Sequence, residues 1–313
     1  MTEARALARG EDEKLDRWSS IPFFVIHALA IVAPFFVPFS WKLVGLAVLL
    51  YYARMAGTTI GYHRYASHRG FKTSRVFQFM LGFWAQTSAQ KGMLWWAAHH
   101  RQHHKYSDQP EDVHSPQRGF LWSHVGWILC QRYAATGEIK DLSRYPELRF
   151  LNRFHLIPPV ALAVGLFLIG GWSWLVWGFF VSTVLLWHGT FVVNSLNHVW
   201  GSRRYATADT SRNNAVLALL TMGEGWHNNH HHFMSSANQG FFWWEVDLSY
   251  YLIRMFRAFG LVWEVRTPPE HVRLATMAAA VDREEPAIRV SASAMAPVAA
   301  GLRRRCAVQI ADV

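Results

Sequence analysis

LIPPVALAVGLFLIGGWSWLVWGFFVSTVLLWHGTFVV, residues 156–193, is an apolar stretch without a single Asp, Glu, Lys or Arg. It is long enough for two helices of the roughly 20 residues that cross ~30 Å of hydrocarbon, joined by a turn at Gly170-Gly171. A similar stretch nearer the N-terminus is divided at Pro38-Phe39-Ser40. The sequence therefore predicts four transmembrane helices in two hairpins, over Ile21–Phe39, Trp41–Gly61, Leu156–Gly170 and Trp172–Val193.

The composition of the whole chain also indicates a membrane protein. Only 17% of its 313 residues are charged, whereas a soluble enzyme carries about 25%. It contains 16 Trp, a residue enriched at membrane interfaces. The net charge of +10 suits attraction to an anionic cytoplasmic leaflet. Nucleic-acid binding would need a basic face on a soluble fold, so we expect no nucleic-acid partner.

The distribution of charge sets the expected orientation. Arg and Lys are dense between the two hairpins and in the N-terminal segment, while the two turns carry almost none. By the positive-inside rule, both termini and the central loop should face the cytoplasm, and we expect a bacterial inner membrane. Short apolar stretches at residues 76–84, 120–130, 241–244 and 250–259 are predicted to form helices lying in the interface.

The chain is expected to have three parts. Residues 1–20 form a cytoplasmic N-terminal segment, residues 21–275 form an all-α membrane domain, and residues 276–313, rich in Ala, Ser, Pro and Arg, form a disordered tail. Within the membrane domain, residues 62–155 and 194–275 should build a cytoplasmic helical cap. The two cysteines, Cys130 and Cys306, match neither a disulfide framework nor a metal pattern.

Most of the 17 histidines are clustered just outside the predicted spans. In two clusters they repeat at i, i+3 and i+4, which places them on one face of a helix. A further cluster has two histidines five residues apart, about 140° apart around a regular helix, so we expect them to hold different ions. A single histidine follows the last span. The nine candidates are His63 and His68; His100, His103 and His104; His227, His230 and His231; and His198.

Nine imidazoles are too many for one ion, since zinc takes about four ligands. Two six-coordinate ions could use them and keep positions for water or oxygen. Imidazole suits Fe, Zn, Cu and Ni alike, and the clusters lack the Glu-x-x-His repeats of soluble di-iron bundles. An all-nitrogen pair of metal sites beside a hydrophobic bundle suits the oxidation of a lipid chain by O₂.

The patterns His63-x4-His68, His100-x2-His103-His104 and His227-x2-His230-His231 resemble the three histidine boxes of membrane fatty acid desaturases. The surrounding residues, such as Asn194-Ser-Leu-Asn-His198, are similar to the acyl-CoA, Δ9-type branch, and the resemblance extends over roughly residues 20–268. It implies four membrane helices, a cytoplasmic cap that holds two iron ions, and a tunnel for a saturated acyl chain.

The resemblance also implies roles for individual residues. His198 would be the ninth ligand and Asn194 would hold a metal-bound water, while Gln90 and Trp96 match positions near the substrate entrance. From the residues themselves, we expect three carboxylates near the boxes to orient imidazoles through their Nδ1–H groups. These are Asp108, Asp112 and Glu224.

The remaining histidines are assigned to supporting positions. His99 and His232 adjoin the clusters but break their spacing, so a role beside the ligands is expected. His27 and His188 lie inside predicted spans and should be packed or hydrogen-bonded. We expect loop or interface positions for the others, which are His114, His124, His155 and His271.

The predicted activity is O₂-dependent introduction of a Δ9 double bond into a saturated acyl chain carried as a CoA thioester. Animal relatives have an Arg-Asp pair that helps bind CoA where this chain has Ala98-His99, so carrier protein and phospholipid stay open as carriers. Because no His-Pro-Gly-Gly haem motif occurs, we expect electrons from a separate ferredoxin or small haem protein with an NAD(P)H reductase.

Two other functions were weighed. A membrane di-iron lipid hydroxylase or ketolase shares histidine boxes, but the order and context of the boxes here fit a desaturase better. A metal transporter would place polar ligands near the bilayer midplane, whereas these clusters lie outside the predicted spans.

Overall fold

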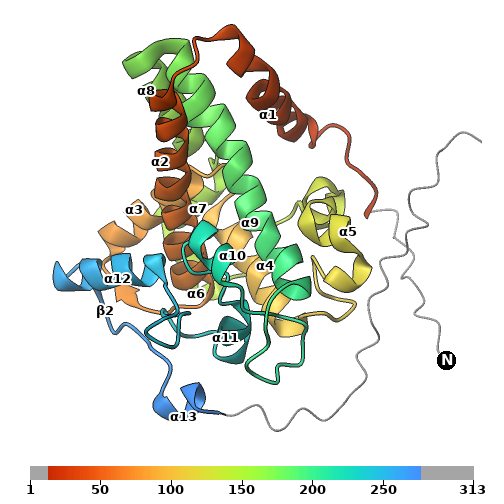
Figure 1. Ribbon diagram of the computed structural model, residues 1–313, viewed down its shortest axis with the longest axis vertical. Helices are drawn as coiled ribbons and strands as arrows, with labels where there is room; N and C mark the ends of the chain where they lie inside the picture. The colour runs from red at the N-terminus through yellow and green to blue at the C-terminus, as the bar shows by residue number, and fades with distance from the viewer. Residues whose placement is uncertain (1–12, 276–313) are drawn as a thin grey trace, which may run out of the picture. The chain divides into compact units, whose positions relative to one another are not determined.

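The computed structural model describes residues 13–275, which are mostly helical (Figure 1). The expected tail and most of the expected N-terminal segment fall outside the described residues. The described part contains long apolar helical runs. They are α1 (Ile21–Val32) with η2 (Ala33–Phe36), α2 (Trp41–Gly57) with the π-helix η3 (Thr58–Ser67), and α8 (Ile157–Trp174) followed by the π-helix η7 (Leu175–Val181) and α9 (Ser182–Val199).

The run from α8 to α9 is broken at the predicted turn. Gly170 (φ −134°, ψ 16°) and Gly171 (φ 63°, ψ −154°) are not helical, and the second combination is open to Gly but strained for other residues. Beyond the turn the chain folds back. The Leu166 side chain, from before the turn, lies against Gly178, from after it. The predicted hairpin is therefore present.

Two runs among the described residues, Trp41–Ser67 and Ile157–Val199, are long and apolar enough to cross a membrane, and Ile21–Phe36 is a shorter apolar helix. Only 11% of the apolar window in the second run is buried, so most of its side chains face outward. Its two halves correspond to the third and fourth predicted spans. The crossing of a bilayer by four helices stays a prediction.

A buried arginine joins α2 to the neighbouring helices. Arg54 donates to the Thr87 carbonyl oxygen at 2.7 Å, and to the hydroxyls of Ser182 and Thr183 at 2.8 Å each. Burying a charge is costly unless it is hydrogen-bonded, and these hydrogen bonds offset that cost. Arg54 thereby fixes α2 against α9 and against the end of α3 (Arg75–Gln86).

The shorter helices mostly gather toward the lower part of Figure 1, at one end of α2 and α9. They come from the two segments that were predicted to form a cap. They are α4 (Met93–Tyr106), η4 (Pro116–Arg118), α5 (Phe120–His124), η5 (Gly126–Leu129), η6 (Gln131–Tyr133), α6 (Lys140–Ser143), α7 (Pro146–Arg153), α10 (Ala215–Leu220), α11 (His227–His232), α12 (Leu248–Ala258) and α13 (Glu270–Arg273).

One sheet occurs within residues 13–275. Its strands β1 (Lys72–Thr73) and β2 (Val262–Trp263) are antiparallel, with Lys72 opposite Trp263. The helix predicted over residues 241–244 is wrong, because these residues form a turn. In this turn Glu245 binds Phe242 twice, through its backbone N–H and through its carboxylate.

Replacing Gly171 by alanine should destabilise the hairpin through backbone strain alone. A Cβ at this position would meet nothing within 4 Å, so the cost is that of a disfavoured φ/ψ combination, about 1–3 kcal/mol. Gly165→Ala is the matched control, because it lies within α8 with equally open space around it. Thermal unfolding in detergent should show a lower Tm for Gly171→Ala only; equal values would contradict the assigned turn geometry.

Candidate metal centre

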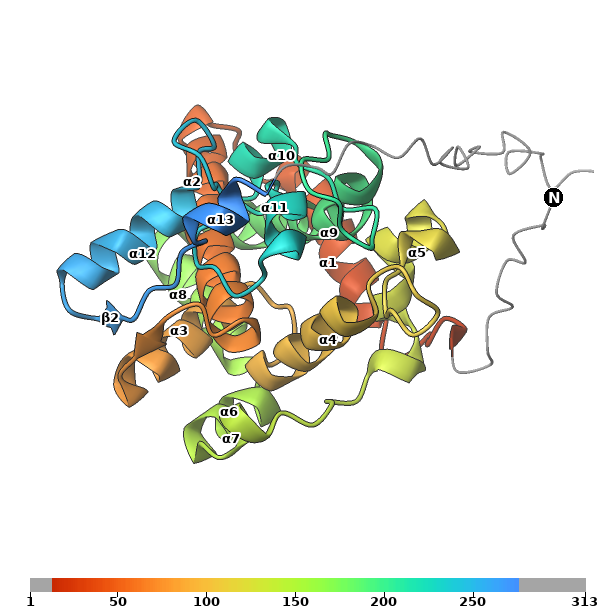
Figure 2. The ribbon, with the colours of Figure 1, turned by 90° about the horizontal axis from the view of Figure 1, so that it is seen from below.

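The predicted histidines converge where η3, α4, α9 and α11 meet, a region seen end-on in Figure 2. One group has five imidazoles whose candidate ligand nitrogens all lie within 4.8 Å of one another. Neighbouring Nε2 atoms are 2.8–3.1 Å apart. The members of this first cluster are His63, His68, His100, His104 and His230.

A second group of four buried imidazoles satisfies the same 4.8 Å limit. Its Nε2 atoms also face one another, at 3.2 Å for His198 and His227 and at 3.4 Å for His103 and His231. The members of this second cluster are His103, His198, His227 and His231. Each cluster thus combines residues from more than one histidine box, and together they contain all nine candidates.

The sequence predicted that His63 and His68 would hold different ions, whereas the structure places both in the first cluster. The reason is local winding. These residues end a π-helix, and the His68 N–H donates to the His63 carbonyl at 3.2 Å, an i→i+5 bond. The wider winding of a π-helix, whose hydrogen bonds join residues five apart, brings the two imidazoles to one side, whereas a regular α-helix would separate them by about 140°.

Three imidazoles are held by carboxylates through Nδ1. The distances are 2.5 Å from His63 to Glu224, 2.9 Å from His103 to Asp112 and 2.6 Å from His231 to Asp209. An ionised carboxylate only accepts hydrogen bonds, so Nδ1 carries the proton in His103 and His231, which are hydrogen-bonded to Asp112 and Asp209. In the neutral ring the lone pair is then on Nε2, the atom that faces into the cluster.

The electrostatics keep these three carboxylates ionised. Burial raises the pKa of Glu224, but the charges of His63 and Arg64 outweigh it and hold that pKa at about 2. Burial likewise opposes ionisation of Asp112 and Asp209, yet contacts with His103 and His231 keep the pKa of each carboxyl below its usual range. Each carboxylate therefore remains an acceptor at neutral pH.

The imidazoles themselves are kept neutral over most of the site. For His100, His104, His227 and His230, burial and then the neighbouring imidazoles hold the pKa well below its ordinary value. A neutral imidazole has a lone pair available for a metal ion, whereas an imidazolium has none. These four imidazoles are therefore in the protonation state that metal binding needs, whereas the charge of Asp112 outweighs burial and raises the pKa of His103.

Two of the three expected carboxylates contact the Nδ1 atom of a candidate ligand, and the third reaches an imidazole through a threonine hydroxyl. Asp112 accepts from His103 Nδ1, and Glu224 lies 2.5 Å from His63 Nδ1. Asp108 accepts from the N–H and hydroxyl of Thr210, at 2.6 and 2.7 Å. The Thr210 hydroxyl is 3.1 Å from His198 Nδ1, while Asp108 itself lies 3.6 Å from that nitrogen.

Sequence reasoning missed two residues beside the second cluster. Asp209 lies 22 positions before His231 in a loop, and no spacing rule connects them. His114 lies in a turn, as expected, but it is also buried, with its ring 4.2 Å from that of His103. The only sequence signal for His114 was its place after Glu111-Asp112.

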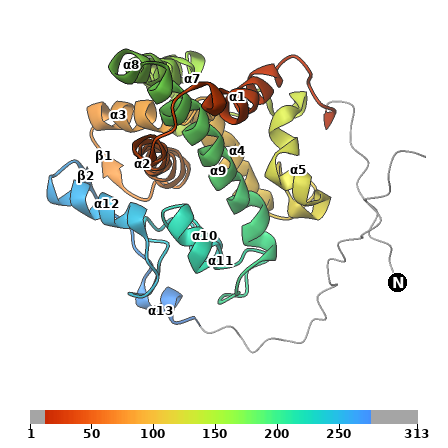
Figure 3. The same cartoon turned by 45° about the horizontal axis from the view of Figure 1, so that its top comes forward.

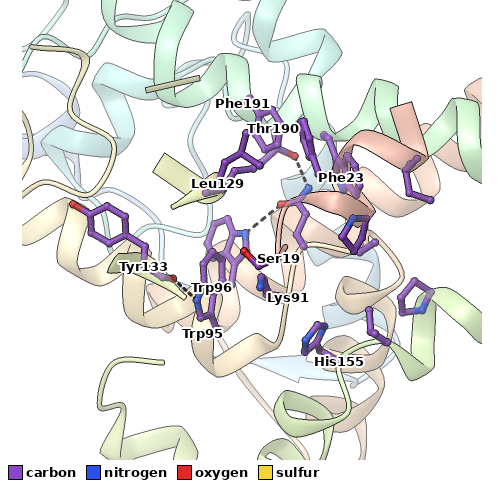
Figure 4. Close-up of a pocket in the computed structure, with 18 of the residues that line it drawn as sticks. Ser19, Phe23, Lys91, Trp95, Trp96, Leu129, Tyr133, His155, Thr190 and Phe191 are labelled. Atoms are coloured by element: carbon purple, nitrogen blue, oxygen red, sulfur yellow. Dashed lines mark hydrogen bonds between the residues drawn. The ribbon is translucent and has the colours of Figure 1, made fainter. Parts of the chain in front are cut away.

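A cavity of about 490 Å³ begins beside the first cluster and runs among the apolar helices (Figure 4). Its lining residues include His100 of the first cluster and Asn194, together with Val164 and Phe179 of the apolar helices. The volume lies in the range of small-molecule sites, about 300–1,000 Å³. Apart from a few polar groups its walls are aliphatic and aromatic, which suits a hydrocarbon chain.

The two expected entrance residues form one hydrogen-bonded unit in the cavity wall. Gln90 donates to the Thr190 hydroxyl at 2.9 Å and accepts from Trp96 Nε1 at 3.3 Å, bonds that are dashed in Figure 4. The Trp96 ring stacks on His100 at 4.9 Å. The wall of the cavity is thereby linked to the first cluster.

Asp209→Asn should weaken metal binding without unfolding the protein. It removes the negative charge that holds the His231 proton on Nδ1, and loss of such a partner typically costs 10–100-fold in metal affinity. Glu147→Gln is the control, because Glu147 pairs with Arg75 at the surface, away from the histidines. Titration with a divalent metal, followed by calorimetry, should show weaker binding for Asp209→Asn only; unchanged affinity would count against the carboxylate's role.

Comparison with known proteins places the chain in a family. The sequence model of the family described as "Fatty acid desaturase" matches residues 39–254. Delta-9 acyl-lipid desaturase 2 of Arabidopsis thaliana is 38% identical over 82% of this chain and 87% of its own length. The corresponding values for sn-2 palmitoyl-lipid 9-desaturase of a Nostoc strain are 37%, 85% and 95%. For icosanoyl-CoA 5-desaturase of Limnanthes douglasii they are 36%, 86% and 77%. With its apolar helices and its two histidine clusters, this chain belongs to the fatty acid desaturase family, and it is an oxidoreductase of fatty acyl chains.

Proposed function

We propose that the two histidine clusters hold two iron ions, five imidazoles facing one and four facing the other. The observation that carries this is the pair His103 and His231. Carboxylates fix the proton of each ring on Nδ1, so two Nε2 lone pairs face each other at 3.4 Å. A cation between the rings removes this repulsion. One metal ion satisfies every lone pair of a cluster at once, whereas a proton satisfies one pair.

The donor set fits iron in a lipid oxidase. All candidate ligands are imidazoles, which suit iron as well as zinc and copper, and six-coordinate ions held by five and four of them keep positions for water and O₂. Asn194 lines the cavity beside the first cluster and is proposed to hold a metal-bound water. When bound, the iron pair supplies O₂ activation. The protein's own residues position the chain and exclude water.

The proposed reaction converts two adjacent methylenes into a double bond. One saturated chain, one O₂, two electrons and two protons give the unsaturated chain and two waters. The cavity has to hold the chain so that a single pair of methylenes lies beside the first cluster. The Gln90–Trp96 unit sits at this place in the wall, and we assign to it the positioning of the chain.

We propose a Δ9 product, since the Arabidopsis and Nostoc relatives are named for a double bond at position 9. The sequence predicts a CoA thioester as the carrier of the acyl chain. The relatives' names include both acyl-lipid and acyl-CoA desaturases, so this carrier is one of two found among them. We further propose that four helices cross the membrane and that both termini and the histidine clusters face the cytoplasm, as the positive-inside rule predicts.

Expression in a desaturase-deficient host should yield fatty acids with a new Δ9 double bond. His231→Ala should lower the amount of product at least 100-fold, because it removes a candidate ligand. His232→Ala is the matched control. His232 is adjacent in α11, but its ring stacks on Tyr205 at 4.0 Å and its Nε2 faces the Val272 carbonyl rather than a cluster. Mass spectrometry with double-bond localisation reads out both variants.

Several outcomes would contradict the proposal. A hydroxylated or keto product would identify the protein as a lipid hydroxylase or ketolase instead of a desaturase. Equal loss in both histidine variants would indicate a folding defect instead of lost ligation.

The purified protein, produced with iron, should also contain about two Fe per chain.

Electrons should come from a separate protein. We expect the purified chain with NAD(P)H alone to give no product, and turnover to appear when a ferredoxin or small haem protein and its reductase are added. The reconstituted mixture without the reductase is the control. Turnover with NAD(P)H and the purified chain alone would refute this proposal.

A further inference from the structure

Residues 87–91, which lie between α3 and α4, are strained and form part of the cavity wall. Ala89 and Lys91 have φ angles of 56° and 68°, in the left-handed region that is unfavourable for residues other than glycine. Both line the cavity, together with Gln90 between them. Strain of this kind persists only where the surrounding structure fixes it, and it gathers at functional sites. This segment is called here the 87–91 loop.

Two neighbouring helices hold the start of the loop by its carbonyl oxygens. From α2, Arg54 donates twice to the Thr87 carbonyl, at 3.0 Å from Nε and at 2.7 Å from Nη2. From α9, Trp187 Nε1 donates to the Ser88 carbonyl at 2.9 Å. α2 packs against both α3 and α9 (Figure 3), so both donors belong to the bundle beside the loop. The start of the loop therefore cannot move without breaking these hydrogen bonds.

The end of the loop is held from the first histidine box. The Tyr62 hydroxyl donates to the Lys91 carbonyl at 2.7 Å. Tyr62 directly precedes His63, a member of the first cluster, and its ring stacks on Trp96 at 5.4 Å. Its side chain is fully buried and does not line the cavity. Tyr62 therefore ties the position of the cavity wall to the position of the candidate metal ligands.

The position of this loop matters for a hydrocarbon chain, which has no polar group along its length. The register of such a chain in the cavity follows from the shape of the wall. The Gln90 side chain is fixed by Thr190 and Trp96, but its backbone lies between the strained residues Ala89 and Lys91. A shift of this backbone by the length of one C–C bond would bring a different pair of methylenes to the first cluster.

We propose that the strained backbone of the 87–91 loop sets the position of the double bond, and that Arg54, Trp187 and Tyr62 are positioning residues that act through its carbonyl oxygens. This rests on the proposed function and names what determines its regioselectivity. The three donors offset the strain and leave the loop one conformation. Alanine at position 89 contributes as well, because glycine there would remove the strain but would allow the backbone further conformations.

Tyr62→Phe removes one of these hydrogen bonds and keeps the ring that stacks on Trp96. After expression in the desaturase-deficient host, the share of double bonds at other positions should rise about fivefold, because small misplacements decide which methylenes react. Tyr51→Phe is the matched control. It also removes a bond of 2.7 Å from a tyrosine hydroxyl to a backbone carbonyl, that of Leu220, and Tyr51 does not line the cavity. Mass spectrometry with double-bond localisation reads out both variants.

Ala89→Gly tests the strain itself. Glycine adopts a positive φ readily, so the Tm should not fall, whereas the share of misplaced double bonds should rise about threefold as the backbone gains freedom. Glu264→Gly is the control. Glu264 has a φ of 46°, but it pairs with Lys72 at the surface and does not line the cavity. A merely structural role of Ala89 would change the amount of product and leave the ratio of double-bond positions at the wild-type value.

A probe that needs no turnover separates this proposal from the proposed function. Stearic acid with a diazirine at its ninth carbon is added to the purified full chain in detergent and irradiated, and peptide mass spectrometry locates the adducts. They should concentrate on few wall residues in the wild type and in Tyr51→Phe, and spread over more of them in Tyr62→Phe. This pattern without any double-bond formation would support the loop's role and refute the desaturase assignment. Equal adduct distributions and equal double-bond positions in the loop variants and their controls would overturn the proposal.

Discussion

The structure depends on nine imidazoles being held together with their Nε2 atoms facing one another. In His103 and His231, carboxylates hold the proton on Nδ1, so the two Nε2 lone pairs face each other at 3.4 Å and repel unless a cation lies between them. Glu224 holds a third ring from outside, through its contact with His63 Nδ1. The burial of these groups is tolerable because each carboxylate has partners. The histidine clusters and the surrounding carboxylates therefore depend on each other: the carboxylates orient the imidazoles, and the imidazoles are the partners that allow the carboxylates to be buried.

Buried ion pairs hold together the segments that surround the histidine clusters. Arg64 lies within η3 and binds both Glu224 and Asp247, at 3.0 and 2.8 Å. Asp247 also caps α12 by accepting from the Tyr250 N–H. This network joins the first histidine box to the segment that follows the third. Because losing one partner of a buried ion pair is destabilising, the network holds η3 against the segments that precede and follow α11.

The apolar cavity has a different proposed role, which is to position a hydrocarbon chain. A hydrocarbon chain has no groups that a protein can recognise by hydrogen bonds, so its position follows from the shape of the cavity. The Gln90–Thr190 and Gln90–Trp96 bonds stiffen the wall near the first cluster. α1, in contrast, has no buried residue. The cavity thus has a hydrogen-bonded wall beside the first cluster and another side formed by α1, which has no buried residue.

The sequence alone determined the features that depend on local pattern. The apolar runs, the turn at Gly170-Gly171 and the i, i+3, i+4 histidines follow from helix periodicity and from the backbone freedom of glycine. Only the tertiary structure decided which imidazoles share a cluster, because the π-helical winding of η3 rotates His63 and His68 onto one face. It also brought Asp209 and His114 to the second cluster. Such contacts join residues from separate elements, and no periodicity within one segment records them.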